Sequence, residues 1–368
     1  MQRRPRLAIR APNWVGDLVM ATPVLEAAVA SDRFAEIRIV LRAHLAALLE
    51  DGPCAEHVVP IATDGEEIAA YRRLAPELLL LLTNSLGAAW RARRARVPER
   101  IGTALSGRRF LLTRSFRPPS KEGRRLPTPT AHLHRDAARL VGLEVDDLHP
   151  RLAVRDEIRA AATTLLERAG LARSAAYALC CPGASFGASK LWPPERFAAV
   201  LDDLHARRGF RGVVTGAPKE EPLVRAVAEA CRHAAIALPA DEGSGGLGGL
   251  KALVAGSRIL IGGDSGPRWI AAAFDVPCVS VMGPNFPEAT ATSLELAAIA
   301  RVEGLECAPC VRKTCPLGHH RCMQDLAADR VIALADDVLG RARSTEPEPF
   351  PDDSPPRCPE PPRPRANR

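Results

Sequence analysis

The sequence is poor in aromatic residues and contains no long apolar run. Aromatic side chains make up 4% of the 368 residues, which disfavours the stacked aromatic surface that many single-strand nucleic-acid-binding proteins use. No segment approaches the roughly 20 apolar residues of a membrane-spanning helix. Arg10, Asn13 and Asp17 interrupt the first apolar run, so it does not resemble a secretory signal. We therefore expect a cytoplasmic protein that does not read nucleic-acid bases.

Apolar residues and basic charge are nevertheless well represented. Hydrophobic residues make up 46% of the chain, and its length exceeds what a single core usually organises, so two domains are expected. The net charge of +7 comes from 50 Lys and Arg against 43 Asp and Glu. This excess favours anionic partners such as a nucleotide, a phosphorylated glycolipid or a membrane surface, although arginine content also reflects genome composition.

Residues 258–284 have the pattern of a strand, a Gly-rich turn, a short helix and a second strand. Asp264 or Ser265 is expected to cap the helix, and Pro267 suits an early helical position. Such a turn, with Gly266 allowing close approach to the backbone, is suited to a phosphate or pyrophosphate. The alternative is an ordinary βαβ turn with a good cap.

Three other turns carry candidate chemistry. Asp17 follows the first strand, where α/β folds place ligands, but it also suits a helix N-cap. The turn at 182–193 supplies Ser185 and Lys190 for phosphate oxygens and lacks the spacing of a Walker loop. Glu220 follows a later strand, where an acidic residue binds ribose in dinucleotide folds or simply suits a helix N-terminus.

Residues 106–130 are expected to form a long basic loop, because they hold many Arg, Pro, Gly and Ser residues and little apolar periodicity. Loops of this length in compact domains are uncommon unless they are functional. We therefore interpret the loop as a clamp on an anionic acceptor, with a solvated or disordered excursion as the alternative. The four residues proposed for the clamp are Arg108, Arg109, Arg124 and Arg125.

Four cysteines cluster near the C-terminus of the second half, at Cys307, Cys310, Cys315 and Cys322. The first pair has the spacing of a zinc half-site, but the remaining spacing is not that of a standard finger or ribbon. A zinc or redox cluster is one interpretation, and reduced thiols that pack a loop near the cleft are the default. The Pro-rich stretch 344–368 is expected to be a disordered tail.

Taken together, four ordered motifs resemble glycosyltransferase family 9, the ADP-heptose:lipopolysaccharide heptosyltransferases, and most of all the heptosyltransferase II type. They are Gly16-Asp17, PGASFGASKLWP at 182–193, DSGP at 264–267 and the cysteine motif at 307–323. The resemblance implies an α/β fold of the GT-B type, with two Rossmann-like domains facing across a cleft. Residues 1–172 would bind the acceptor and residues 173–343 the nucleotide sugar.

The resemblance also implies roles for individual residues. Asp17 matches the general base, Ser185 and Lys190 match contacts to the donor phosphates, and the DSG turn matches the diphosphate loop. It further implies heptosyl transfer from ADP-heptose to the second-heptose position of an anionic lipopolysaccharide precursor at the inner membrane surface, with no cofactor and no metal. Trp269 stands where the family usually has His, so an inactive nucleotide-sugar-binding homologue is an alternative, as is a family 9 enzyme with another acceptor.

Overall fold

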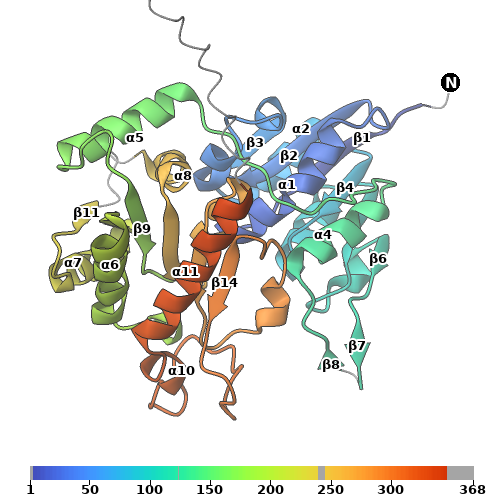
Figure 1. Cartoon of the computed structure of the whole chain (residues 1–368). Coiled ribbons are helices and arrows are strands. Elements are labelled where there is room, and N and C mark those ends of the chain that lie inside the picture. The colour runs from blue at the N-terminus through green and yellow to red at the C-terminus, as the bar shows by residue number, and fades with distance from the viewer. Residues whose placement is uncertain (1–2, 123, 239–244, 346–368) are drawn as a thin grey trace, which may run out of the picture.

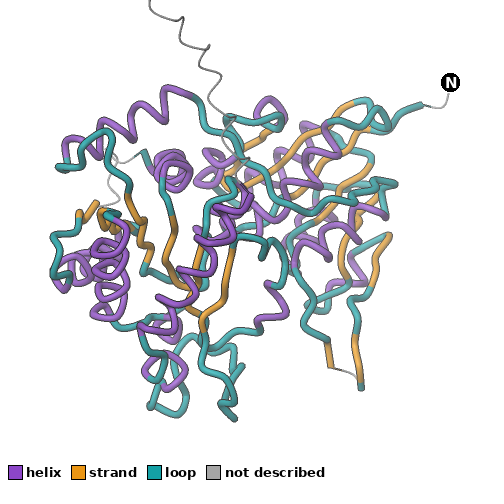
Figure 2. Tube along the Cα trace, viewed as in Figure 1, coloured by secondary structure: helices purple, strands orange, loops and turns teal. Residues whose placement is uncertain are grey.

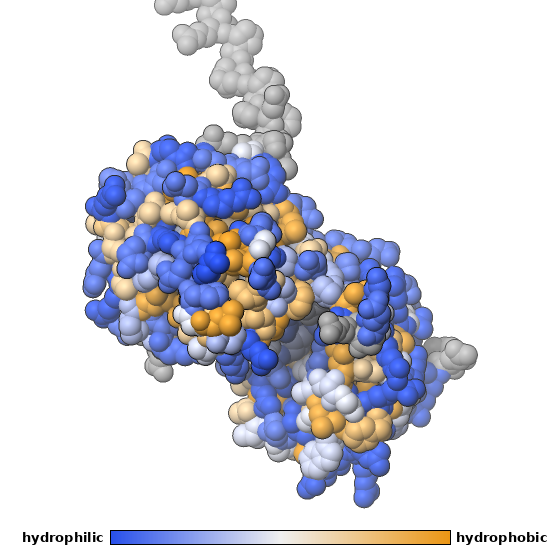
Figure 3. All heavy atoms as spheres, turned by 90° about the horizontal axis from the view of Figure 1, so that it is seen from below, coloured by the Kyte–Doolittle hydropathy of each residue, from blue (hydrophilic) through white to orange (hydrophobic). Residues whose placement is uncertain are grey.

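Two parallel β-sheets organise the chain. The structure is a computed structural model that describes residues 3–122, 124–238 and 245–345. In Figure 1 the first sheet lies at the right and the second at the left, and the helices pack around both (Figure 2). Seen from below, the molecule has two lobes with a hollow between them (Figure 3).

The first sheet has the strand order β3-β2-β1-β4-β5-β6, and all its pairs are parallel. Its strands are β1 (Arg6–Arg10), β2 (Glu36–Arg42), β3 (Val58–Ile61), β4 (Leu78–Leu81), β5 (Glu99–Thr103) and β6 (Arg114–Phe116). The helices of this half are α1 (Val15–Val29), α2 (Asp64–Leu74), α3 (Leu86–Arg94) and α4 (Thr130–Arg139), with 3-10 turns η1 (Ala43–Leu48), η2 (Ala55–His57) and η3 (Arg108–Leu111).

The second sheet repeats this order as β11-β10-β9-β12-β13-β14, again with parallel pairs. Its strands are β9 (Tyr177–Cys181), β10 (Arg211–Thr215), β11 (Ile236–Leu238), β12 (Ile259–Gly263), β13 (Cys278–Val281) and β14 (Ala297–Ala300). The helices are α5 (Asp156–Arg168), α6 (Pro194–Arg208), α7 (Glu221–Ala230), α8 (Gly246–Gly256), α9 (Pro267–Ala273), α10 (Arg321–Gln324) and α11 (Ala328–Thr345), with 3-10 turns η4 (Ala188–Lys190), η5 (Pro218–Glu220) and η7 (Pro287–Thr290).

The sheets are buried on both faces, as parallel sheets require. In β1, Leu7 and Ile9 enter one apolar cluster, and Ala8 enters another on the opposite face. The cluster that holds Leu7 also contains Leu179 of β9 and Leu253 of α8. One apolar core is therefore continuous from the first sheet to the second.

A buried ion pair joins the two halves at the end of η1. The ammonium Nζ of Lys251, on α8, lies 3.0 Å from Asp51 Oδ2 and donates to the carbonyl oxygen of Ala153 at 2.9 Å. Both charged side chains are almost fully buried. A buried cation requires partners of this kind, so the contact fixes α8 against the first half of the chain.

Several expectations for the secondary structure are corrected. Residues 106–130 do not form one long loop, because β6 adds a sixth strand to the first sheet and β7 (Ser120–Lys121) pairs with β8 (Arg124–Arg125) in a hairpin that projects in Figure 1. The helix α11 continues to Thr345, and the rest of the expected tail lies outside the described residues.

Candidate active site

Asp17 lies in the first turn of α1, directly after the turn that follows β1. The N-cap of this helix is Trp14, so the alternative that Asp17 caps it is wrong. Burial raises the pKa of the Asp17 carboxyl to about 6, while the positive charge of Lys190 acts in the opposite direction. A carboxylate with a raised pKa near a fixed positive charge has the properties of a general base that works close to neutral pH.

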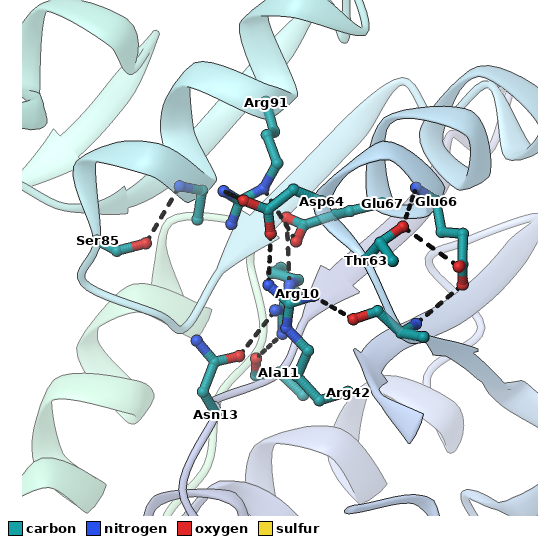
Figure 4. A network of polar contacts seen from close by, with 12 residues as sticks. Arg10, Ala11, Asn13, Arg42, Thr63, Asp64, Glu66, Glu67, Ser85 and Arg91 are labelled. Atoms are coloured by element: carbon teal, nitrogen blue, oxygen red, sulfur yellow. Dashed lines mark hydrogen bonds and ion pairs between the residues drawn. The ribbon is translucent and has the colours of Figure 1, made fainter. Parts of the chain in front are cut away.

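A buried polar network holds the turn that leads to Asp17, and the sequence did not reveal it (Figure 4). Arg10, at the end of β1, donates to the carbonyl oxygen of Ala11 at 2.6 Å and to Asn13 Oδ1 at 2.7 Å. Its Nε lies 3.2 Å from Glu67 Oε1, and both side chains are fully buried. Arg91 approaches the other oxygen of Glu67 at 3.1 Å. The only sequence signal was an arginine at the end of an apolar strand.

Lys190 belongs to the second half of the chain and is buried in the 3-10 turn η4. Its ammonium lies 2.6 Å from Asp264 Oδ2 and donates to the Asp264 carbonyl oxygen at 2.9 Å. The ring of Phe186 lies 5.0 Å from the same nitrogen. The charge of Lys190 also acts on Asp17, so the base candidate and the cation candidate are near one another although 173 positions separate them in the sequence.

Asp264 begins the turn after β12 and holds Lys190 in place. Its carboxylate accepts from Lys190 and from the side-chain amide of Asn285. Because these two donors occupy the carboxylate, Asp264 would act on a bound diphosphate mainly by fixing the position of the Lys190 ammonium. Ser265 and Gly266 continue the turn, and Gly266 rather than Asp264 or Ser265 is the N-cap of the seven-residue helix α9. The predicted side-chain cap is therefore wrong.

Two glycines allow the halves of the site to approach one another. A Cβ atom on Gly16 would lie 2.6 Å from Cδ1 of Trp269, and one on Gly266 would lie 2.7 Å from Val15. The indole of Trp269 is buried, and the Arg268 guanidinium stacks 4.2 Å from the centre of its ring. Trp269 therefore fills the contact between α1 and α9.

The other donor-site candidates lie at the same sheet edge. Ser185 is exposed on the turn after β9. The Glu220 carboxylate accepts from the backbone N–H of Ala217 at 2.8 Å and lies so close to Gly183 that a Cβ there would clash with it. The contact with Ala217 agrees with the interpretation that Glu220 simply suits a helix N-terminus. The proximity to Gly183 places the same carboxylate next to the turn at 182–193.

One of the four arginines of the expected clamp does not lie on the surface. Arg108 is fully buried, which lowers its pKa to about 10, and it donates to the carbonyl oxygens of Thr83 and Thr103. The prediction that Arg108 belongs to an exposed clamp is therefore wrong. Its guanidinium N–H groups are bonded inside the protein, where they join η3 to the segment before α3. Arg109 is exposed on η3, and Arg125 is exposed on β8 beside Arg124.

The cysteine-containing loop between β14 and α10 packs directly on the turn that carries Lys190. The backbone N–H of Ser189 donates to the carbonyl oxygen of Lys313 at 3.0 Å, and its hydroxyl donates to Arg312. The ring Nε2 of His320 donates to the Ser189 carbonyl oxygen at 2.8 Å. The loop therefore fixes the backbone at Ser189, the residue before Lys190.

The thiols of this loop are free, as are all the cysteines in the described part of the chain. The pKa of Cys322 rises to about 11, through burial first and then through the neighbouring thiols Cys310, Cys315 and Cys307. Backbone N–H groups that point at Cys315 lower its pKa. Within the described ranges no three His, Cys, Asp or Glu side chains are arranged to hold a metal ion.

None of the described helices combines the length and the apolar character that crossing a bilayer requires.

Comparison with known proteins agrees with the motifs. The model of glycosyltransferase family 9 (heptosyltransferase) matches residues 70–321. A lipooligosaccharide heptosyltransferase 2 of Campylobacter jejuni is 32% identical over 160 residues, which cover 43% of this chain and 49% of that protein. The chain therefore matches about half the length of this relative.

Two solved structures share the fold along nearly the whole chain. A family 9 glycosyl transferase from Veillonella parvula superposes with a TM-score of 0.71 at 22% identity, covering 91% of this chain and 97% of that one. The E. coli ADP-heptose heptosyltransferase II superposes with a TM-score of 0.68 at 21% identity, covering 92% and 99%. The two Rossmann-like domains thus have the GT-B arrangement, and the family model, the motifs and the fold agree that the chain belongs to glycosyltransferase family 9.

Proposed function

We propose that the protein transfers heptose from ADP-L-glycero-D-manno-heptose to the second-heptose position of the lipopolysaccharide inner core. The observation that carries the proposal is the contact between the two halves beside Asp17, where Gly266 lies against Val15 and the positive charge of the buried Lys190–Asp264 pair acts on the Asp17 carboxyl. The names of the relatives supply the substrate classes, since they include an ADP-heptose heptosyltransferase II and a lipooligosaccharide heptosyltransferase 2.

In the proposed reaction Asp17 accepts the proton of the acceptor hydroxyl as its oxygen attacks the anomeric carbon of the donor. The bond between that carbon and the β-phosphate oxygen breaks, and ADP leaves with the electron pair. Attack from the face opposite the leaving group inverts the anomeric centre. Lys190 offsets the negative charge that grows on the departing diphosphate, a role for which no metal is invoked.

The remaining candidates have supporting roles in this proposal. Residues 173–343 bind the donor, with Ser185, Ser265 and Gly266 at the phosphates and Glu220 at the ribose. Residues 1–172 bind the acceptor, with Arg109, Arg124 and Arg125 facing its anionic groups from the cytoplasmic side of the inner membrane. Arg108 supports this surface from within instead of contacting the acceptor.

Replacing Asp17 by Asn tests the role of the base. The amide keeps the size of the side chain and cannot accept the proton, so turnover measured as ADP release should fall by roughly 10²–10⁴-fold. The affinity for ADP, measured by calorimetry, should stay within about two-fold because Asp17 faces the acceptor. Turnover close to that of the parent enzyme would remove Asp17 from the mechanism.

The buried position of Trp269 bears on the alternative of an inactive homologue. Its indole fills the contact between α1 and α9, so the departure from the family's usual His is explained by packing between the two halves. This favours an active enzyme. A family 9 enzyme with another acceptor remains the second candidate, and ADP release with defined core acceptors, with and without the first heptose, distinguishes the two.

A further inference from the structure

Three large exposed apolar side chains lie on two neighbouring elements of the first half. Phe110 on η3 is 73% exposed, Trp90 on α3 is 49% exposed and Leu86 on α3 is 45% exposed. Leu86 and Trp90 are four residues apart, so they lie on the same face of α3. Single exposed apolar side chains are common on protein surfaces. Three of them on adjoining elements indicate a surface that binds a partner.

The fold keeps these elements together. The elements α3 and η3 are in contact. The buried guanidinium of Arg108, the first residue of η3, donates to the carbonyl oxygen of Thr83 and lies 3.4 Å from Asn84 Oδ1. Ser85 then caps α3 by accepting from the backbone N–H of Ala88. Arg108 thus joins the turn that carries Phe110 to the start of the helix that carries Leu86 and Trp90.

The same two elements are strongly basic. The segment 86–98 has arginine at 91, 93, 94 and 96 and no acidic residue, and η3 has the sequence RRFL. Arg93, Arg94 and Arg109 are exposed. The guanidinium of Arg94 lies over the Trp90 ring, 5.2 Å from its centre, so charge and aromatic surface are directly adjacent.

We propose that this surface is a docking site for an anionic lipid bilayer. We call it the α3–η3 patch, and it consists of Leu86, Trp90, Arg93, Arg94, Arg109 and Phe110. Aromatic and aliphatic side chains enter the interfacial region of a bilayer, while arginines on the same helix bind the headgroups. The combination of exposed apolar side chains with the exposed arginines Arg93, Arg94 and Arg109 fits an anionic membrane better than it fits a protein surface or a neutral membrane.

The position of the patch also fits the proposed function. Both α3 and η3 begin at the carboxyl edge of the first sheet, after β4 and β5, and Asp17 follows β1 at that same edge. A bilayer bound there would present a lipid-anchored acceptor to the half of the cleft that holds the proposed base. The inference deepens the proposed function in this respect, but vesicle binding itself requires neither donor nor acceptor.

Vesicle binding of the full-length protein tests the proposal. Co-sedimentation should show binding to vesicles of phosphatidylcholine mixed with phosphatidylglycerol, little binding to pure phosphatidylcholine, and loss of binding as salt is raised. Each of Arg93→Gln, Arg94→Gln and Arg109→Gln should weaken binding about five-fold, the effect expected for one basic residue near an anionic surface. Trp90→Ser and Phe110→Ser should each weaken it by roughly ten-fold.

Two further measurements sharpen the test. In a Trp14→Phe background Trp90 is the remaining exposed tryptophan, because Trp192 and Trp269 are buried, and its emission should shift to shorter wavelength when vesicles bind. The matched control is Leu317→Ser, which removes a side chain of 59% exposure from the second half and should not change binding. Circular dichroism and ADP affinity should match the parent protein in every patch variant.

Several outcomes would overturn the inference. Equal binding to neutral and anionic vesicles would exclude the charge argument, and unchanged binding of the Trp90→Ser/Phe110→Ser double variant would exclude the patch. If the double variant instead abolished a concentration-dependent dimer in sedimentation, the partner would be a second copy. If it raised the KM of a delipidated acceptor while vesicle binding persisted, the patch would belong to acceptor recognition.

Discussion

At the residue scale, the charges of Asp17, Lys190 and Asp264 depend on one another. Burial alone would keep the Asp17 carboxyl protonated well above the usual range for an aspartic acid, and the ammonium of Lys190 limits that rise to a pKa of about 6. The Asp264 carboxylate in turn holds the ammonium at 2.6 Å. The lysine therefore has two effects in our proposal, since it favours the ionised base and faces the leaving diphosphate.

This coupling predicts the pH dependence of the enzyme. Only ionised Asp17 accepts a proton, so kcat/KM should rise as the pH increases through about 6. Lys190→Met removes the charge that lowers the Asp17 pKa, so the acid limb of the profile should move to higher pH, and kcat should fall more than donor affinity. An unshifted acid limb, with loss of donor affinity alone, would show that Lys190 only binds the donor.

At the element scale, the sequence predicted regular elements better than it predicted burial. The strand, turn, short helix and strand expected within residues 258–284 are β12, the turn at Asp264, α9 and β13, and Asp17 and Lys190 lie in the segments that follow β1 and β9. The hairpin β7–β8 was missed because its short strands carry charges instead of alternating apolar residues. Arg108 and Arg109 are adjacent and identical in type, so only tertiary contacts separate the buried one from the exposed one.

The two adjacent arginines give a matched pair of variants. Arg108→Ala removes the guanidinium that donates to the Thr83 carbonyl oxygen and leaves the Thr103 carbonyl oxygen with the backbone N–H of Leu105 as its donor, so the free energy of unfolding should fall by about 2–5 kcal/mol in urea denaturation. Arg109→Ala should change the same free energy by about 0.5 kcal/mol or less, because the side chain is exposed.

The exposed arginines should affect the acceptor instead of the fold. In the Arg109→Ala/Arg125→Ala double variant the KM of the acceptor should rise, that of ADP-heptose should stay constant, and added salt should weaken acceptor use less than in the parent enzyme. Equal salt dependence in both proteins, with an unchanged acceptor KM, would show that this surface does not bind the acceptor.

At the scale of the whole molecule, the proposed active site lies where the two halves meet. Lys251 joins α8 to Asp51 in the first half, and the core around Leu7 continues into the second sheet. Single-residue patterns in the sequence cannot reveal such contacts, because their partners lie far apart along the chain. Trp269 shows this well: the sequence marked it only as a departure from the family's His, whereas the structure shows it packed on Gly16.

The contact between Gly16 and Trp269 can be tested by a double-mutant cycle. A methyl group at position 16 would lie 2.6 Å from the indole Cδ1, so Gly16→Ala should lower the free energy of unfolding by about 1–3 kcal/mol and reduce turnover by displacing Asp17. Trp269→His leaves a smaller ring at the same place and should cost stability alone through the space it opens. Because the added methyl group occupies part of that space, the double variant should be more stable than the sum of the single changes predicts, by about 1 kcal/mol or more.

Urea denaturation measures the stabilities of these variants, and ADP release measures their turnover. If the changes in unfolding free energy of the two single variants simply add, and if turnover in the double variant is no higher than in Gly16→Ala, this contact does not set the position of α1 relative to α9.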